Sequence, residues 1–285
     1  MPLVFVPTPL GNLRDITLRA RDALASCALL VAEDSRVARK LLNALELPGK
    51  EIWTYHEHNA RSATAAILDR ALTETVCVVT DAGTPGISDP GSDLVAAARE
   101  NGVAVDVLPG PSALIGAAVL SGFPLRRFVF EGFAPRAAAQ RKRAFQESLR
   151  LGIPSVWYES PQRIRKALND LEEIAPSARV FLLREYTKKF EQQIAGTPSE
   201  VAARLPEPVL GEIALVMMAE DAAPEPAEAA EVDLTGEIDA LLADGLPVSA
   251  IAKQLSDRGL GERRHVYAQV SERKRAGKES PHGKG

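Results

Sequence analysis

Short apolar runs alternate with amphipathic helical patterns along the first 120 residues of the chain. Strand and helix alternation of this kind predicts a mainly parallel sheet with helices on both faces. The strands are expected at Leu3–Val6, Ala28–Ala32, Val76–Val79 and Val103–Leu108, and the helices at Thr17–Ser26, Val37–Leu47, Ala63–Leu72 and Asp93–Glu100. We therefore expect residues 1–120 to form one α/β domain.

The pattern restarts near Phe123-Pro124 and predicts a second α/β domain over residues 121–219. Two of its strands, Arg179–Leu183 and Phe190–Ile194, are close enough in sequence to form a hairpin, which predicts a mixed sheet. The other strands are expected at Phe128–Glu131, Ser155–Tyr158 and Ile213–Met218, and the helices at Ala137–Leu149, Arg163–Ile174 and Ser199–Arg204.

The C-terminal part has a different composition. Residues 220–232 are rich in Ala, Pro and Glu without a periodic apolar face, which is typical of a linker. Residues 233–275 carry three short amphipathic patterns, at Leu234–Ala243, Val248–Leu255 and Arg263–Val270, and predict a small helical module, followed by a disordered tail at 276–285. The net charge is −4, but the last thirty residues are basic, so a polyanionic partner should bind that end.

Some classes of protein are disfavoured by what the chain contains. No apolar segment approaches the ~20 residues that span a bilayer, and no signal sequence is apparent, so we expect a cytoplasmic protein without a membrane partner. Cys27 and Cys77 are flanked by apolar residues and are expected to be buried thiols. The four histidines lack zinc-site spacing, and we expect no protein-bound metal.

The segment Asp81–Gly91, which directly follows the strand at Val76–Val79, is a loop of glycines, prolines and aspartates. Glycine allows the backbone to approach a ligand closely, and proline stiffens the path. A phosphate is disfavoured, because Asp81 and Asp89 would repel it and no Walker lysine or complete dinucleotide fingerprint is present. Carboxylates in such a loop suit ribose hydroxyls, an ammonium group or a sulfonium.

A second turn, Leu108–Ala113, opens a helix that runs toward Ser121. Backbone amides near Ser112 and Ala113 can bind a carboxylate through unpaired N–H groups and the positive end of the helix dipole. Together the two turns describe S-adenosylmethionine better than a nucleoside triphosphate. The alternative is that both are structural turns at strand ends.

Several long motifs then occur in order along the chain. They resemble the ribosomal RNA small-subunit methyltransferase I family, a branch of the tetrapyrrole-methylase-like S-adenosylmethionine enzymes, from about Pro2 to Met218, and the C-terminal helical module resembles that of the family. The motifs are Val6–Thr17, Ala32–Arg36, Tyr55–Asn59, Asp81–Gly91, Pro109–Ser112, Glu131–Phe133, Tyr158–Pro161 with Arg163, and Arg184–Glu191.

This resemblance implies 2′-O-ribose methylation of a cytidine in the decoding region of 16S ribosomal RNA by a homodimer. The RNA is expected to be methylated within the small ribosomal subunit. It also implies a fold of two α/β domains with the donor in the cleft between them. By position, the donor would be bound by Pro7, Leu10, Asp81, Gly83, Thr84, Pro85, Ser112, Ala113, Tyr158, Leu183 and Ile213. One departure is Leu210, where the family commonly has a lysine; Lys188 or Lys189 can replace that charge.

Catalysis must align the ribose oxygen with an already electrophilic methyl group and remove its proton. Ala32–Arg36 follows the second strand, where ligand-facing residues of such sheets lie. Glu33 or Asp34 can accept the proton, and Arg36 can bind a phosphate. Because Asp34 or Ser35 can instead cap the next helix, Glu33 is the first candidate for the base.

Other polar residues are candidates for substrate contacts. His56, His58 and Asn59 cluster in one turn, although histidines in polar turns are often only solvated. Arg163, Arg184 and Lys188 are expected at phosphates or bases, with ion pairs to Glu159, Glu185 and Glu191 as the alternative. The basic cluster Arg136, Arg141, Lys142 and Arg143 fits an RNA-gripping loop or a solvated helical face.

Two other functions remain open from the sequence. One is methyl transfer to a tetrapyrrole or to a modified protein side chain. The other is a non-catalytic RNA-binding protein of ribosome assembly. The Tyr55–Asn59 and Arg184–Glu191 motifs and the basic C-terminal module favour an RNA substrate.

Overall fold

The computed structural model describes residues 2–56, 58–89, 91–220, 234–258, 260 and 263–276. The chain divides into two compact units, Met1–Ala222 and Ala223–Gly285, and each is described by itself. Apart from Glu220 and Ala276, the predicted linker at 220–232 and the predicted tail at 276–285 lie outside the described residues.

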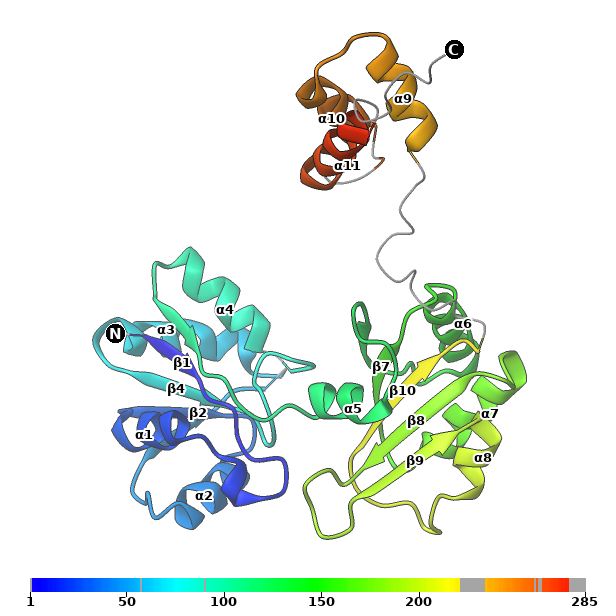
Figure 1. The fold of residues 1–285 in the computed structure, drawn as a ribbon. Coiled ribbons are helices and arrows are strands. Elements are labelled where there is room, and N and C mark those ends of the chain that lie inside the picture. The colour runs from blue at the N-terminus through cyan, green and yellow to red at the C-terminus, as the bar shows by residue number, and fades with distance from the viewer. Residues whose placement is uncertain are drawn as a thin grey trace, which may run out of the picture. The chain divides into compact units, whose positions relative to one another are not determined.

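The first sheet of the larger unit is parallel throughout, as the sequence predicted, with the strand order β3-β2-β4-β1-β5 (Figure 1). Because successive side chains of a strand point to opposite faces, Leu3 and Phe5 pack toward α3 and α4, whereas Val4 and Val6 pack toward α1 and α2. The elements are β1 (Leu3–Phe5), β2 (Leu29–Ala32), β3 (Glu51–Thr54), β4 (Val76–Val79), β5 (Val105–Val107), η1 (Leu13–Asp15), α1 (Leu18–Ser26), α2 (Ser35–Ala44), α3 (Ala60–Thr73) and α4 (Gly91–Glu100).

The second sheet is mixed, with the order β6-β7-β10-β8-β9. β6 and β7 are parallel, the other pairs are antiparallel, and β8 and β9 form the predicted hairpin. One face carries α6, α7 and α8, with Phe145, Leu168 and Val201 in their common core. The elements are β6 (Val129–Phe133), β7 (Ser155–Glu159), β8 (Arg179–Arg184), β9 (Gln192–Gly196), β10 (Ile213–Met218), α6 (Ala138–Leu149), α7 (Ile164–Ile174) and α8 (Pro198–Ala203).

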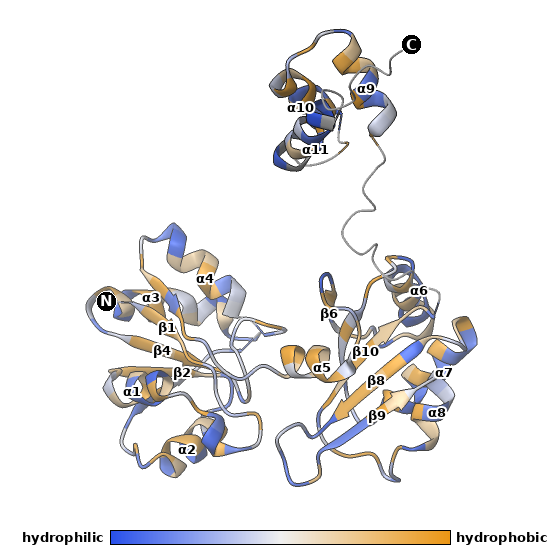
Figure 2. Cartoon of the chain, in the orientation of Figure 1, coloured by the Kyte–Doolittle hydropathy of each residue, from blue (hydrophilic) through white to orange (hydrophobic). Residues whose placement is uncertain are grey.

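Helix α5 (Ala113–Ser121) covers the other face of the second sheet. Its Leu114 and Ala117 share a core with Val156 and Phe181. The sequence pattern grouped this helix with the first sheet, because alternation shows that a helix follows a strand but not which sheet the helix covers. The helix is apolar around most of its circumference (Figure 2), which matches a position against the buried face of the second sheet.

Strand β9 begins two residues later than expected. Phe190 is 64% exposed and precedes the strand, whereas Ile194 is buried within it. The Glu191 carboxylate accepts a hydrogen bond from the Thr187 amide at 2.8 Å, so these residues close the loop between β8 and β9 rather than extending the ladder.

The smaller unit contains α9 (Thr235–Ala243), α10 (Val248–Asp257) and α11 (Arg263–Ala276). Its three helices have a core of their own, which includes Ile238, Ile251 and Val270. Two of its basic residues are paired with carboxylates: Arg258 with Glu237 at 2.8 Å and Arg273 with Asp239 at 2.7 Å.

The cysteines and the lengths of the helices bear on two expectations from the sequence. Cys27 and Cys77 are buried free thiols, as predicted. Within the part of the chain that the structure describes, no helix has the length and apolar character that crossing a bilayer requires.

Candidate functional site

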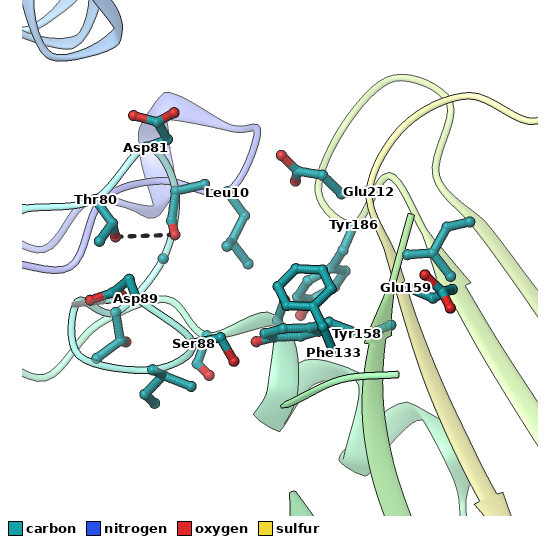
Figure 3. Close-up of a pocket in the computed structure, with 18 of the residues that line it drawn as sticks. Leu10, Thr80, Asp81, Ser88, Asp89, Phe133, Tyr158, Glu159, Tyr186 and Glu212 are labelled. Carbon is teal, nitrogen blue, oxygen red and sulfur yellow. Dashed lines mark hydrogen bonds between the residues drawn. The ribbon is translucent and has the colours of Figure 1, made fainter. Parts of the chain in front are cut away.

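A cavity of about 410 Å³ lies in the larger unit, between the carboxyl ends of the first sheet and the second sheet (Figure 3). The first sheet contributes residues that directly follow its strands, where parallel sheets of this kind bind ligands. These are Leu10 after β1, Glu33 after β2, the segment 80–84 with 87–89 after β4, and Ser112 and Ala113 at the start of α5. The second half contributes Phe133, residues 158–161, Leu183, Tyr186 and residues 211–214.

The loop after β4 has a defined shape, which its own hydrogen bonds maintain. The Asp89 carboxylate accepts hydrogen bonds from the amides of Gly86 at 2.9 Å and Gly91 at 2.8 Å. Gly83 and Gly86 have φ of +81° and +93°, a region that side chains rarely adopt. The Thr84 hydroxyl donates to the Pro111 carbonyl at 2.9 Å, so this loop and the turn before α5 are joined.

The cavity is acidic. Glu33, Asp81, Asp89, Glu159 and Glu212 line it, and of the described lining residues none is lysine, arginine or histidine. Burial raises the pKa of Glu33, and the neighbouring Asp81 and Asp89 carboxylates raise it further. Burial also raises the pKa of Asp81. Such a cavity attracts a cation and repels a phosphate.

Glu33 and Asp34 are adjacent in sequence but differ in their roles in the structure. Asp34 is the N-cap of α2 and accepts from the Arg36 amide at 2.8 Å, so the helix begins two residues earlier than the expected Val37. Its carboxylate is also paired with the Arg36 guanidinium at 2.6 Å, which holds the pKa of Asp34 well below its usual range. Glu33 lines the cavity and Asp34 does not.

Most of the residues expected to bind the donor do lie together at this cavity. Pro7 and Pro85 do not line it. Pro7 instead packs against Gly110, where an added Cβ would lie 2.5 Å from the Pro7 Cβ, and Pro85 is buried in its loop. The lining residues from that set are Leu10, Asp81, Gly83, Thr84, Ser112, Ala113, Tyr158, Leu183 and Ile213.

The histidine turn after β3 does not line the cavity. The Asn59 side chain shapes this turn, because its Oδ1 accepts from the His56 amide and its Nδ2 donates to the Thr54 carbonyl, both at 2.8 Å. The rings of His56 and His58 lie 5.8 Å apart. Arg36, the candidate for a phosphate contact on α2, does not line the cavity either; it is exposed and paired with Asp34.

The three candidates of the second half are each engaged within the protein. Arg163 is paired with Glu159, and Lys188 with Glu185 at 2.9 Å and Glu212 at 3.1 Å. Arg184 instead donates to the side chain of Gln192 at 3.1 Å and to the Leu210 carbonyl at 3.0 Å. Lys188 therefore lies beside Glu212, close in sequence to Leu210, the position at which the resemblance leads us to expect a lysine.

The basic cluster at the start of α6, expected as an RNA-gripping loop or a solvated helical face, is only partly exposed: Arg136 and Arg143 are exposed, but Arg141 is not. Arg141 is 3% exposed and paired with Asp170. Lys142 is paired with Glu173, and Arg143 with Glu147 at 2.8 Å. A cluster of cations in a sequence is usually exposed, but here an acidic residue on α7 allows one of them to be buried.

Sequence reasoning assigned no role to Phe133 and Tyr186, although both line the cavity. Glu212 also lines it, within the Gly211–Ile213 segment that the resemblance placed near the donor. Tyr186 lies against Gly116 of α5, where an added Cβ would come within 2.4 Å of the Tyr186 ring. The available signals were the Glu131–Phe133 and Arg184–Glu191 motifs, which contain Phe133 and Tyr186. Gly116 also signals a close approach, since glycine within a helix otherwise weakens it.

Comparison with known proteins gives consistent results. The tetrapyrrole (corrin/porphyrin) methylase family matches residues 2–202. A protein named ribosomal RNA small subunit methyltransferase I from Streptococcus pyogenes is 36% identical over 94% of this chain and 93% of its own length. A protein of the same name from Thermotoga maritima is 39% identical over 75% of this chain and 97% of its own length. Another, from Synechocystis, is 37% identical over 93% of this chain and 95% of its own length.

A solved structure supports the same fold. The crystal structure of uroporphyrin III C-methyl transferase from Thermus thermophilus matches with a TM-score of 0.55 and covers 77% of this chain and 98% of that chain. At 19% identity, the likeness concerns the fold alone.

Proposed function

The chain belongs to the tetrapyrrole methylases and, within them, to the ribosomal RNA small subunit methyltransferase I family, and we propose that it methylates 16S ribosomal RNA with S-adenosylmethionine as the donor. The acceptor is the 2′-hydroxyl of a cytidine in the decoding region. The observation that supports this proposal most is the acidic cavity, without a lining cation among the described residues, at the carboxyl ends of the first sheet's strands.

The cavity fits the charges of this donor. S-adenosylmethionine carries a sulfonium and an ammonium group, which Asp81 and Glu212 would attract, and a carboxylate. The side chain of Ser112 makes no capping hydrogen bond at the start of α5, so the first amides of this helix can take that carboxylate. Leu10, Leu183 and Ile213 supply apolar lining for the remainder of the donor.

The sulfonium supplies an electrophilic methyl group, so the protein's task is to position the ribose and accept its proton. Glu33 is the candidate for this base, because it lines the cavity and its carboxylate has no ion-pair partner among those identified in the structure. A raised pKa also brings a carboxylate closer to that of an efficient general base. Asp34, held by Arg36, serves as a helix cap.

RNA is held mainly by the smaller unit in this proposal. Arg264, Lys274 and Arg275 are exposed on α11, and such side chains contribute phosphate contacts that add affinity without sequence choice. Arg258 and Arg273 are already paired with Glu237 and Asp239, and we assign them a structural role. Small ribosomal subunits are the proposed substrate.

We also propose a homodimer. Helix α5 exposes Ile115 to 51% and Val119 to 63%, and these residues lie one turn apart on the helix. An exposed apolar stripe of this kind supports burial against a second copy. Light scattering should give twice the mass of one chain, and a single-chain mass would contradict the dimer.

The experiment that tests the function has two parts. Calorimetry should detect binding of S-adenosylmethionine to the protein alone. The protein should then transfer tritiated methyl groups from S-adenosylmethionine to small ribosomal subunits that were purified from cells lacking this methylation. Donor binding without transfer to subunits or to naked 16S RNA would contradict the RNA acceptor and favour another acceptor, and failure to bind the donor would favour a non-catalytic protein.

A further inference from the structure

Phe133, at the end of β6, presents its ring to the cavity. Phe133 is 57% exposed, and among the residues that the structure describes it is the only exposed large apolar residue lining this cavity. It lies 5.5 Å from the Tyr158 ring, in a tilted arrangement, in front of Tyr158 in Figure 3. One side of Phe133 is thus supported by an aromatic ring while much of its surface stays accessible.

An irregularity in β6 aims this side chain. The register between β6 and β7 shifts between Phe130 and Gly132, and Gly132 has a φ of +72°. In a regular strand Phe130 and Phe133 would point to opposite faces. The bulge instead allows both rings to contact Tyr158, Phe130 at 5.0 Å and Phe133 at 5.5 Å. Bulges near sites commonly redirect a side chain in this way.

Two arginines, the buried Arg141 and the half-buried Arg163, hold the segment that follows Phe133. Arg163 donates to the Ala134 carbonyl at 3.1 Å, and Arg141 donates to the carbonyls of Pro135 at 2.9 Å and Arg136 at 3.0 Å. Each guanidinium is fixed in turn by a carboxylate, Glu159 for Arg163 and Asp170 for Arg141. Three consecutive carbonyls are therefore bound by charged donors, which restricts the motion of the backbone beside Phe133.

A rigid, accessible aromatic ring at the edge of an acidic cavity suits a flat, uncharged ligand group. Nucleobases fit this description, and stacking on an aromatic side chain contributes about 1–3 kcal/mol per base. Proteins that recognise RNA commonly bind unpaired bases that are splayed out of the RNA, and an aromatic side chain replaces the stacking that such a base loses. The phosphates meanwhile avoid the carboxylates of the cavity.

We propose that Phe133 is the platform on which the base of the acceptor nucleotide stacks, and that Arg163 and Arg141 are positioning residues that hold this platform. The proposal rests on the proposed function, because it requires an RNA acceptor. Arg163 then acts through the Ala134 carbonyl and Phe133 rather than by binding an RNA phosphate.

The test compares Phe133→Leu and Phe133→Trp with the wild type, using small ribosomal subunits as the acceptor. Phe133→Leu should lower kcat/KM for the subunits by about 5- to 150-fold, the equivalent of the stacking free energy, while Phe133→Trp retains most of it. The affinity for S-adenosylmethionine, measured by calorimetry, should change less than twofold. An equal loss of donor affinity would place the adenine of the donor on this ring and overturn the proposal, as would wild-type transfer by Phe133→Leu.

The positioning role of Arg163 is tested separately, by the kinetics of a double mutant and by the salt dependence of RNA binding. Arg163→Met should lower kcat/KM in the wild-type background but have little further effect in the Phe133→Leu background, because both changes remove the same platform. The dependence of RNA binding on salt should keep its slope. A slope reduced by about one would identify a lost phosphate contact and overturn the positioning role.

The two proposals fail in distinguishable ways. Absence of methyl transfer by the wild-type protein, with the donor bound, contradicts the RNA acceptor and with it the platform. Transfer by the wild type that Phe133→Leu leaves unchanged contradicts the platform alone.

Discussion

Glu33 occupies a position where ionisation is disfavoured by burial and by two neighbouring carboxylates. Only the ionised form can accept a proton from a ribose hydroxyl. Because the pKa of Glu33 is raised, its protonated fraction persists to a higher pH than for an exposed glutamate. The rate of methyl transfer should therefore fall as pH decreases through this raised pKa and level off above it.

Glu33→Gln tests this assignment. The substitution should lower kcat by about 10²- to 10⁴-fold and remove the acidic limb of the pH profile, because general base catalysis is lost. Glu212→Gln is the matched control, since it removes a negative charge from the same cavity but leaves the proposed base in place. The rate of methyl transfer by this variant should still fall at low pH. An unchanged kcat in Glu33→Gln would exclude Glu33 as the base.

The same residue has a predictable effect on stability. A raised folded-state pKa means that the folded protein binds this proton more tightly than the unfolded chain does, so ionisation of Glu33 destabilises the fold above that pKa. Glu33→Gln should thus have a Tm equal to or above that of the wild type at neutral pH. The difference should shrink as pH falls below the raised pKa, and a lower Tm at neutral pH would contradict the account.

Asp81 is expected to recognise charge on the donor. Asp81→Asn keeps the shape of the side chain but removes its charge, so the affinity for S-adenosylmethionine should drop by tenfold or more. The affinity for S-adenosylhomocysteine, whose sulfur is uncharged, should drop less. Calorimetry with both ligands measures the two changes, and equal losses would show that charge on the sulfur is not what Asp81 recognises.

At the scale of single elements, the carboxylate that caps α2, Asp34, directly follows Glu33, the proposed catalytic base. Asp34→Ala should destabilise the protein by about 1 kcal/mol through loss of the helix cap, whereas Asp34→Asn keeps the cap and costs a few tenths. Both variants should retain most of their methyl transfer. A large loss of kcat in Asp34→Asn, with stability preserved, would return Asp34 to the list of catalytic candidates.

Local sequence patterns were sufficient to predict most elements. Apolar runs such as Val76–Val79 become strands because both faces of a parallel sheet are buried, and glycine and aspartate after that strand predict a ligand loop. Non-local pairing was beyond such patterns. Burial of Arg141 depends on Asp170, 29 residues away, and the sheet that α5 covers depends on the whole chain.

The candidate site was predictable to the same extent. Asp81 and Ser112 were expected at the cavity because they follow strands of the first sheet, whose ends meet at one edge. Phe133 was not identified as a site residue, because the expected strand ended at Glu131 and the Glu131–Phe133 motif alone did not show that this ring faces the cavity. Its exposure results from the bulge in β6, which a sequence pattern of period two does not reveal.

At the scale of the whole molecule, the two units should separate donor binding from RNA binding. The larger unit contains the complete cavity and its own cores, so a chain that ends at Glu220 should bind S-adenosylmethionine with wild-type affinity. Its affinity for 16S RNA should fall, and the salt dependence of that affinity should become shallower because phosphate contacts are lost. Undiminished RNA affinity would contradict the role assigned to the smaller unit.

The central claim is methylation of a single ribose in small-subunit RNA, and analysis of the modified nucleoside tests it most directly. Unmethylated small subunits would be treated with the protein and S-adenosylmethionine, and their RNA digested, separated by mass and mapped. The account predicts one 2′-O-methylcytidine, located in the decoding region, whose formation requires Glu33. A methyl group on a base, or on riboses at many positions, would contradict it.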